Sequence, residues 1–86
     1  MRLAGMARFF LNLFNDQDVP DDEGADLPDL AAAKKRAIEG ARALIAEHVM
    51  DGRPIDLSHR IEVADETGRV LAAIPFREVI TINDAG

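Results

Sequence analysis

The segment from Leu30 to about Met50 constrains the fold most, because it has the periodicity of one long amphipathic helix. Asp29 is the expected N-cap, Gly52 is the expected stop, and Pro54 prevents the helix from resuming. A single helix of this kind can cover one face of a sheet. Its expected inward positions recur every three or four residues: Leu30, Ala33, Ala37, Ala41, Leu44 and His48.

The segments on either side of this helix have the composition of β-strands. Residues 8–14 (RFFLNLF) are typical of a strand, and residues 17–20 could run back as a short edge strand. Residues 61–76 (IEVADETGRVLAAIPF) indicate a second hairpin that turns at residues 65–68. We therefore predict an α+β fold of ββαββ order, in which two β-hairpins form a mostly antiparallel sheet of about four strands with the helix on one face.

The length of 86 residues indicates one domain, because two cores could not both be stabilised in so short a chain. We expect this single domain at residues 6–82, with a loose N-terminal extension at residues 1–5 and a loose C-terminus at residues 83–86. Met6 could be the native start. No run approaches the ~18 apolar residues of a membrane span, and no cleavage site follows the apolar beginning. With no cysteine and no sign of secretion, we expect a cytoplasmic protein.

The charge of the chain argues against nucleic acids and anionic membranes as partners. Acidic residues outnumber basic ones sixteen to ten, which gives a net charge of −6. Binding to a phosphate backbone depends on lysine and arginine displacing counterions, and anionic lipid attracts the same basic residues.

An acidic segment at residues 16–29 carries seven carboxylates and no basic residue. An EF-hand calcium loop would need a glycine at its sixth position and a glutamate at its twelfth, and frames that start at Asp16 or Asp18 supply neither. Helix entry is the favoured interpretation, because acids stabilise the positive N-terminal end of a helix. We expect the acids here, Glu23 among them, to neutralise a basic cluster at the helix start. The proposed cap and electrostatic cluster consists of Asp26, Asp29, Lys34, Lys35 and Arg36.

The basic residues at the helix start could instead bind a phosphate group, although no glycine-rich phosphate loop precedes them. The letters of a catalytic triad occur at residues 56–59 (DLSH), but neighbours on an extended chain point to opposite sides. The only other histidine, His48, lies on the apolar stripe of the helix. We therefore expect no enzyme activity, no cofactor and no metal site.

The sheet has apolar side chains on both faces, whereas the chain supplies one helix to cover them. Phe10, Phe14 and Leu71 fall on the face away from the helix and form the candidate interaction surface. Exposed apolar patches of this kind often mark contacts with another protein. The alternative is that residues 79–82 fold over this face.

Several motifs resemble a family of small bacterial domains of unknown function. They are the aromatic first strand (ARFFLNLF, residues 7–14), DEG at 22–24, LPDL at 27–30, an alanine-rich helix, and the hairpin at 61–76. The resemblance spans residue 6 to about residue 79 and implies no reaction, cofactor or catalytic residue. A fainter local resemblance is to HicB-type antitoxins, which also lead from an aromatic hairpin through a "DLP" turn into an alanine-rich helix.

These features favour a non-catalytic protein-interaction module that self-associates through the bare sheet face or an edge strand. A homodimer is expected, and a different protein partner is the alternative at the same surface. The second hypothesis is a small-ligand or regulatory binding protein that uses the acidic segment and the basic helix start. The third is an antitoxin-like regulator, which depends on the HicB resemblance alone.

Overall fold

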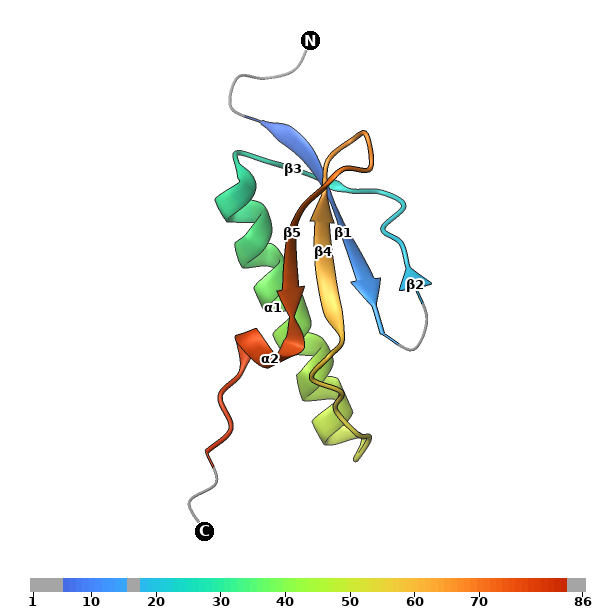
Figure 1. Ribbon diagram of the computed structural model, residues 1–86, viewed down its shortest axis with the longest axis vertical. Helices are drawn as coiled ribbons and strands as arrows, with labels where there is room; N and C mark the ends of the chain where they lie inside the picture. The colour runs from blue at the N-terminus through green and yellow to red at the C-terminus, as the bar shows by residue number, and fades with distance from the viewer. Residues whose placement is uncertain (1–5, 16–17, 84–86) are drawn as a thin grey trace.

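The computed structural model describes residues 6–15 and 18–83. The extension expected at residues 1–5 and most of the loose C-terminus expected at residues 83–86 lie outside this range. The described chain folds into one sheet and two helices (Figure 1). In chain order the elements are β1 (Ala7–Phe14), β2 (Asp18–Val19), β3 (Ala25–Leu27), α1 (Leu30–Met50), β4 (Arg60–Ala64), β5 (Val70–Pro75) and α2 (Phe76–Val79).

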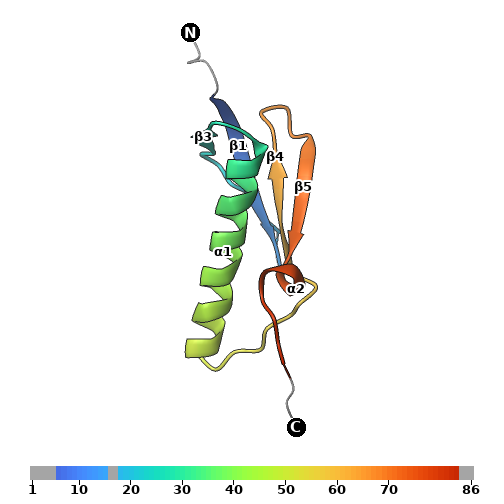
Figure 2. The ribbon, with the colours of Figure 1, turned by 90° about the vertical axis from the view of Figure 1, so that its left-hand side faces the viewer.

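The sheet is antiparallel throughout and has the order β2-β1-β4-β5, with β3 also paired to β1. Both predicted hairpins are present, β1 with β2 and β4 with β5. The long helix α1 lies along one side of the sheet (Figure 2). The predicted α+β fold of ββαββ order is therefore confirmed. Within the described residues, no helix is long and apolar enough to cross a membrane.

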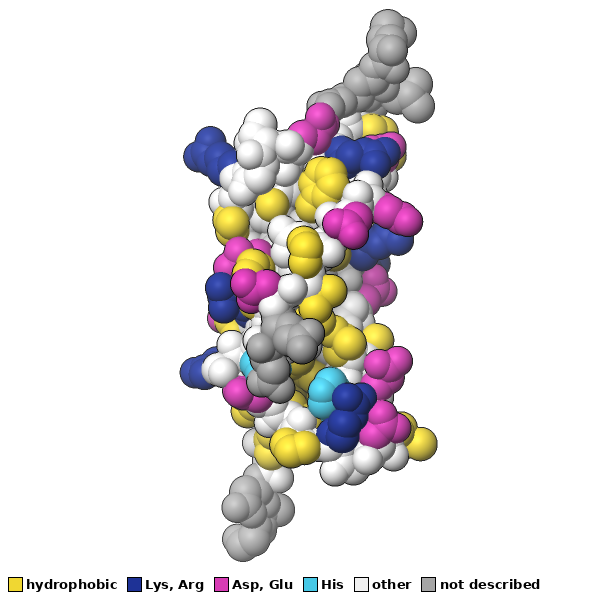
Figure 3. All heavy atoms as spheres, turned by 90° about the vertical axis from the view of Figure 1, so that its right-hand side faces the viewer, with side chains coloured by type: hydrophobic (Ala, Val, Ile, Leu, Met, Phe, Trp, Pro, Cys, Tyr) yellow, Lys and Arg dark blue, Asp and Glu magenta, His cyan; other side chains and the backbone are white. Residues whose placement is uncertain are grey.

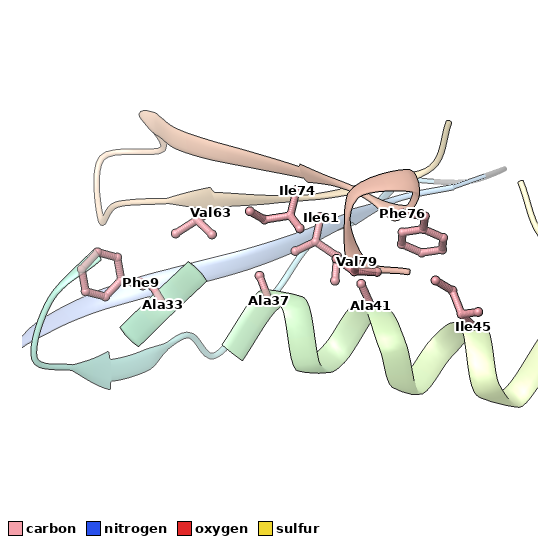
Figure 4. Packing of buried hydrophobic residues seen from close by; sticks show 10 residues of the cluster. All are labelled: Phe9, Ala33, Ala37, Ala41, Ile45, Ile61, Val63, Ile74, Phe76 and Val79. Atoms are coloured by element: carbon pink, nitrogen blue, oxygen red, sulfur yellow. The ribbon is translucent and has the colours of Figure 1, made fainter. Parts of the chain in front are cut away.

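The core lies between α1 and the sheet (Figure 4). The face of α1 that meets the sheet is built largely of alanines, and Ala33, Ala37 and Ala41 are completely buried. Because alanine side chains are short, the helix can pack closely against the larger residues of the strands. The buried residues opposite and beside these alanines are Phe9, Ile45, Ile61, Val63, Ile74, Phe76 and Val79.

Both ends of α1 are capped as the sequence predicts. The side chain of Asp29 accepts a hydrogen bond from the Ala32 N–H at 2.8 Å. At the other end Gly52 adopts a left-handed conformation with φ 70°. There the Arg53 N–H donates to the His48 carbonyl at 2.8 Å and the Gly52 N–H donates to the Val49 carbonyl at 3.1 Å. This pair of bonds is a Schellman motif, and it turns the chain back beside the last turn of the helix.

The strand β3 and the position of the C-terminal segment were not settled by the sequence prediction. The end of the acidic segment forms β3, a short strand that the composition did not indicate. The C-terminal segment begins as the short helix α2, whose Val79 is buried on the α1 side of the sheet. The Val79 carbonyl accepts a hydrogen bond from Arg42 Nε on α1 at 2.8 Å. Up to and including Val79, the C-terminal segment therefore lies on the α1 side of the sheet and does not cover Phe10 and Phe14.

Candidate functional site

The outer edge of β1 is covered along its length. β3 pairs with Ala7–Phe9 and β2 pairs with Leu13 and Phe14, which leaves residues 10–12 between them. Here the Leu11 N–H donates to Asp21 Oδ2 at 3.1 Å, so a carboxylate takes the place of a neighbouring strand. The acidic segment thus acts as a cover for a sheet edge.

The Asp21 carboxylate also organises its own loop. Its Oδ1 accepts the N–H groups of Glu23 at 3.1 Å and Gly24 at 3.0 Å, and the Asp21 N–H donates to Asn12 Oδ1 at 2.9 Å. Burial alone raises the pKa of Asp21, but the N–H groups of Gly24, Leu11 and Glu23, with the charge of Arg36, outweigh it and lower the pKa. The charged form of Asp21 is therefore the form that the fold stabilises.

The face of the sheet away from α1, called the open face here, carries Phe10, Asn12, Phe14, Arg60, Glu62 and Ala73. Its two phenylalanines are half-buried rather than bare. The Arg60 guanidinium carbon lies 4.6 Å from the centre of the Phe14 ring. The loop at Gly24 approaches Phe10 so closely that a Cβ on Gly24 would lie 2.9 Å from the ring. Hydrophobic side chains still form a band along the side of the molecule in Figure 3.

Leu71 does not join Phe10 and Phe14, contrary to the expected grouping. The register of β4 and β5 shifts between Val63 and Ala64, so that consecutive β4 residues face Ala72 and Val70. Leu71 is left without a partner of its own and packs against the buried core. A bulge of this kind reverses the side to which a residue points, which strict alternation along the sequence cannot anticipate.

The outer edge of β5 contrasts with that of β1. Within residues 6–15 and 18–83, no segment pairs with this edge, and β5 is the outermost strand at the right of Figure 2. The Phe76 N–H donates to the His59 carbonyl at 2.8 Å, so the backbone groups of every second residue, counted back from Phe76, face β4. The backbone groups of Ile74 and Ala72 therefore bond to β4, whereas the N–H and C=O of Ala73 point outward. No residue of β5 is charged.

The expected electrostatic cluster at the start of α1 forms only in part. Asp29 caps the helix, but Asp26 forms a two-pronged ion pair with Arg8 of β1, at 3.1 and 3.2 Å. Lys34, Lys35 and Arg36 are exposed. A cavity of about 560 Å³ lies beside them, with Leu27, Ala32, Lys35, Arg36, Glu39 and Gly40 as its lining.

A second cavity, of about 220 Å³, lies on the open face between the Asp21 loop and the β4–β5 turn. Three carboxylates line it, those of Asp21, Asp65 and Glu66. Asp65 accepts hydrogen bonds from Thr67 and from the Arg69 N–H, so its carboxylate stabilises the β4–β5 turn. No group of metal-binding side chains suited to hold an ion occurs in the described part of the chain.

A third cavity brings together the two histidines, which sequence reasoning placed apart. His48, Arg53, Pro54, Asp56 and His59 line about 290 Å³ at the C-terminal end of α1. The turn at Gly52 leads the chain back across the end of the helix, and this was the only sequence signal for the site. Figure 3 shows a histidine beside basic and acidic side chains toward this end of the molecule.

The third cavity does not have the geometry of a catalytic triad. Ser58 Oγ donates to Asp56 Oδ1 at 2.6 Å, and His59 Nε2 lies 3.3 Å from Asp56 Oδ2. The carboxylate therefore stands between the hydroxyl and the imidazole, whereas a nucleophile needs direct contact with its base. The Ser58 hydroxyl, with its N–H and the charges of His59 and Arg77, lowers the pKa of Asp56.

Comparison with known proteins identifies the family. The family model of DUF6894, a domain of unknown function, matches residues 8–77. The chain belongs to this family. The match runs from β1 into α2, so it includes both sheet edges and all three cavities. Neither the curated proteins nor the solved structures gave a significant match.

The DUF6894 match accounts for the resemblance to a domain of unknown function that the motifs indicated. It assigns no reaction, ligand or partner to any residue.

Proposed function

We propose that this DUF6894 domain is a non-catalytic protein-interaction module that forms a homodimer by pairing the β5 edges of two copies. The observation that carries the proposal is the outward N–H and C=O of Ala73 on an uncharged edge strand. Natural proteins commonly protect such edges with charged side chains, bulges or a covering segment. The edge of β1 is protected in this way, and the middle of β5 is not.

The β5 edge is suited to a symmetric partner. In an antiparallel pair related by a twofold axis, Ala73 would face Ala73 of the second copy and exchange two hydrogen bonds with it. Ala72 and Ala73 are small, so the side chains nearest the axis do not obstruct the approach. Val70, a residue that is 51% exposed, would be covered near the Pro75 end of the partner strand.

The open face is a less suitable contact than the sequence suggested. The Gly24 loop covers part of Phe10, and Arg60 lies over Phe14. Leu71 packs against the core. These three contacts reduce the apolar area that the open face offers, and they favour the edge over the face as the site of association.

The experiment is size-exclusion chromatography with light scattering on the wild type and on Ala73→Pro. Proline removes the outward N–H and is tolerated at the edge of a sheet, so the variant should be a folded monomer. Ala73→Ser is the matched control, because it keeps the N–H and should remain a dimer. Circular dichroism establishes that each variant is folded.

Two outcomes would contradict the proposal. One is a wild type that is monomeric at high micromolar concentration. The other is a Phe10→Glu/Phe14→Glu variant that dissociates while Ala73→Pro stays dimeric, which would place the contact on the open face.

A small-ligand or regulatory binding protein is the second candidate. The cavity of about 560 Å³ beside Lys35 and Arg36 supports it. Asp26 pairs with Arg8 and therefore does not neutralise these cations. An antitoxin-like role has no support beyond the order of hairpin, "DLP" turn and helix.

A further inference from the structure

We propose that, in the β5-paired homodimer, residues 80–83 of each copy dock on the second copy and place Ile82 in a cavity beside its β4–β5 turn. Residues 80–83 are called the arm here. The inference rests on the proposed function, because the arm and the cavity meet only when two β5 edges pair. It adds a side-chain contact on the α1 side of the sheet to the backbone pairing at Ala73.

The arm is an uncharged segment with an exposed apolar side chain. It begins at Ile80, whose backbone is extended with φ −132° and ψ 159°. Thr81, Ile82 and Asn83 follow, and Ile82 is 70% exposed. β-branched residues such as these favour an extended chain. Within residues 6–15 and 18–83, no strand pairs with the arm.

The point at which the arm leaves the body of the molecule is fixed. Val79, the residue before the arm, is buried, and its carbonyl accepts the hydrogen bond from Arg42 Nε at 2.8 Å. Figures 1 and 2 show the chain after α2 leaving the end of the sheet in the direction in which β5 runs. The arm therefore points past the end of its own β5, and its free length starts at Val79.

The cavity, called the turn cavity here, lies at the other end of the sheet. It is lined by Ala7, Phe9 and Leu71, together with Arg8 and residues 65–67 of the β4–β5 turn. Ala7 and Leu71 are half-buried and pack against the core, which gives the cavity an apolar floor. Its volume of about 390 Å³ is more than ten times the roughly 30 Å³ of a water molecule, so it has room for an isoleucine side chain.

An arm cannot reach the turn cavity of its own copy. The cavity adjoins the start of β5 and α2 follows its end, so the six residues of this strand separate the two. At about 3.3 Å per residue, the strand is about 20 Å long. The chain from Val79 to Ile82 spans at most about 10 Å. Contact between Ile82 and a turn cavity therefore requires a second copy.

Pairing of the β5 edges brings the arm to the turn cavity of the second copy. When Ala73 faces Ala73, Pro75 of one copy lies opposite Leu71 of the other, so α2 begins beside the second copy's turn cavity. A twofold axis perpendicular to the sheet leaves the α1 sides of both copies on one face, and α2 and Leu71 both lie on that side. Neighbouring strands are about 4.8 Å apart, so a reach of about 10 Å covers two strands of the second copy.

The first test measures the dissociation constant of the dimer by analytical ultracentrifugation. Ile82→Ser should remain a folded dimer but raise this constant roughly tenfold, because an apolar side chain of each copy loses its buried contact. Val19→Ser is the matched control, since Val19 is also exposed but lies on β2 at the opposite edge of the sheet. It should leave the constant unchanged. Circular dichroism establishes that each variant is folded.

The second test observes the contact directly by NMR on a one-to-one mixture of ¹³C-labelled and unlabelled protein. Filtered NOE spectra of this mixture report only contacts between copies. NOEs are expected between the methyl groups of Ile82 and those of Leu71, in addition to NOEs between the two β5 strands.

The outcomes distinguish this inference from the proposed function. NOEs between the β5 strands without any from Ile82 to Leu71 would overturn the arm contact and retain the homodimer. A dissociation constant that Ile82→Ser leaves unchanged, or that Val19→Ser raises equally, would count against the arm contact in the same way. A monomeric wild type without NOEs between copies would overturn the homodimer and the arm contact together.

Discussion

Along the outer edge of β1, backbone groups are met by β3, by the Asp21 carboxylate and by β2, whereas along β5 the backbone of Ala73 points outward without a described partner. The covered edge of β1 adjoins the most acidic segment of the chain, whereas no residue of β5 is charged. The difference indicates that the acidic segment serves to close one side of the sheet. It also leaves the β5 side as the one at which we propose that a second chain pairs.

The largest expected effect comes from Gly24, which lets the acidic loop close on β1. It has φ 72°, and a Cβ there would lie 2.9 Å from the Phe10 ring and 3.0 Å from the Phe9 carbonyl. Gly24→Ala should lower the free energy of unfolding by about 2–4 kcal/mol, because the left-handed backbone and the crowding both cost free energy. Urea denaturation followed by circular dichroism measures the loss.

Gly68→Ala is the matched control for this prediction. Gly68 has φ 86°, but nothing lies within 4 Å of an added Cβ. Its substitution should cost only the backbone part, about 1–2 kcal/mol. Equal losses at the two glycines would mean that the close approach of the loop to β1 contributes nothing to stability.

A smaller effect is expected from Asp21→Asn. The amide cannot accept from Leu11 and from the Glu23 and Gly24 N–H groups in the same arrangement, since one of its ends is a donor. The free energy of unfolding should fall by about 1–3 kcal/mol. Asp22→Asn, at the exposed neighbouring acid, should change it by less than about 0.5 kcal/mol. An equal response of the two variants would contradict the role assigned to Asp21.

Local periodicity was sufficient to predict the helix, its Asp29 cap and the hairpin at residues 61–76. These features depend on residues a few positions apart, whose spacing the sequence displays directly. The same holds for Gly68, whose left-handed conformation the turn pattern required.

The features that the sequence did not indicate depend on contacts between distant segments. β3 forms because the acidic loop turns back onto β1, and Leu71 packs on the core because of a bulge against β4. The third cavity needs the turn at Gly52 to bring His59 beside His48. Asp26 meets Arg8 across 18 residues of chain, which local charge counting could not anticipate.

The smallest expected effect is a dependence on pH that distinguishes the β1 edge from the β5 edge. Asp21 has a folded-state pKa below its ordinary value of 3.8, so its stabilising effect is complete above that value and disappears as the pH falls through the folded pKa. As Asp21 becomes protonated, its bond with the Leu11 N–H weakens, and the Leu11 amide proton signal should move. The Ala73 amide, with no carboxylate at its edge, should not follow this transition. NMR spectra recorded downward from about pH 5, while the protein is still folded, compare the two amides directly. A Leu11 signal that stays constant as Asp21 titrates would show that the Asp21 carboxylate does not bond to the edge of β1, contrary to its proposed role.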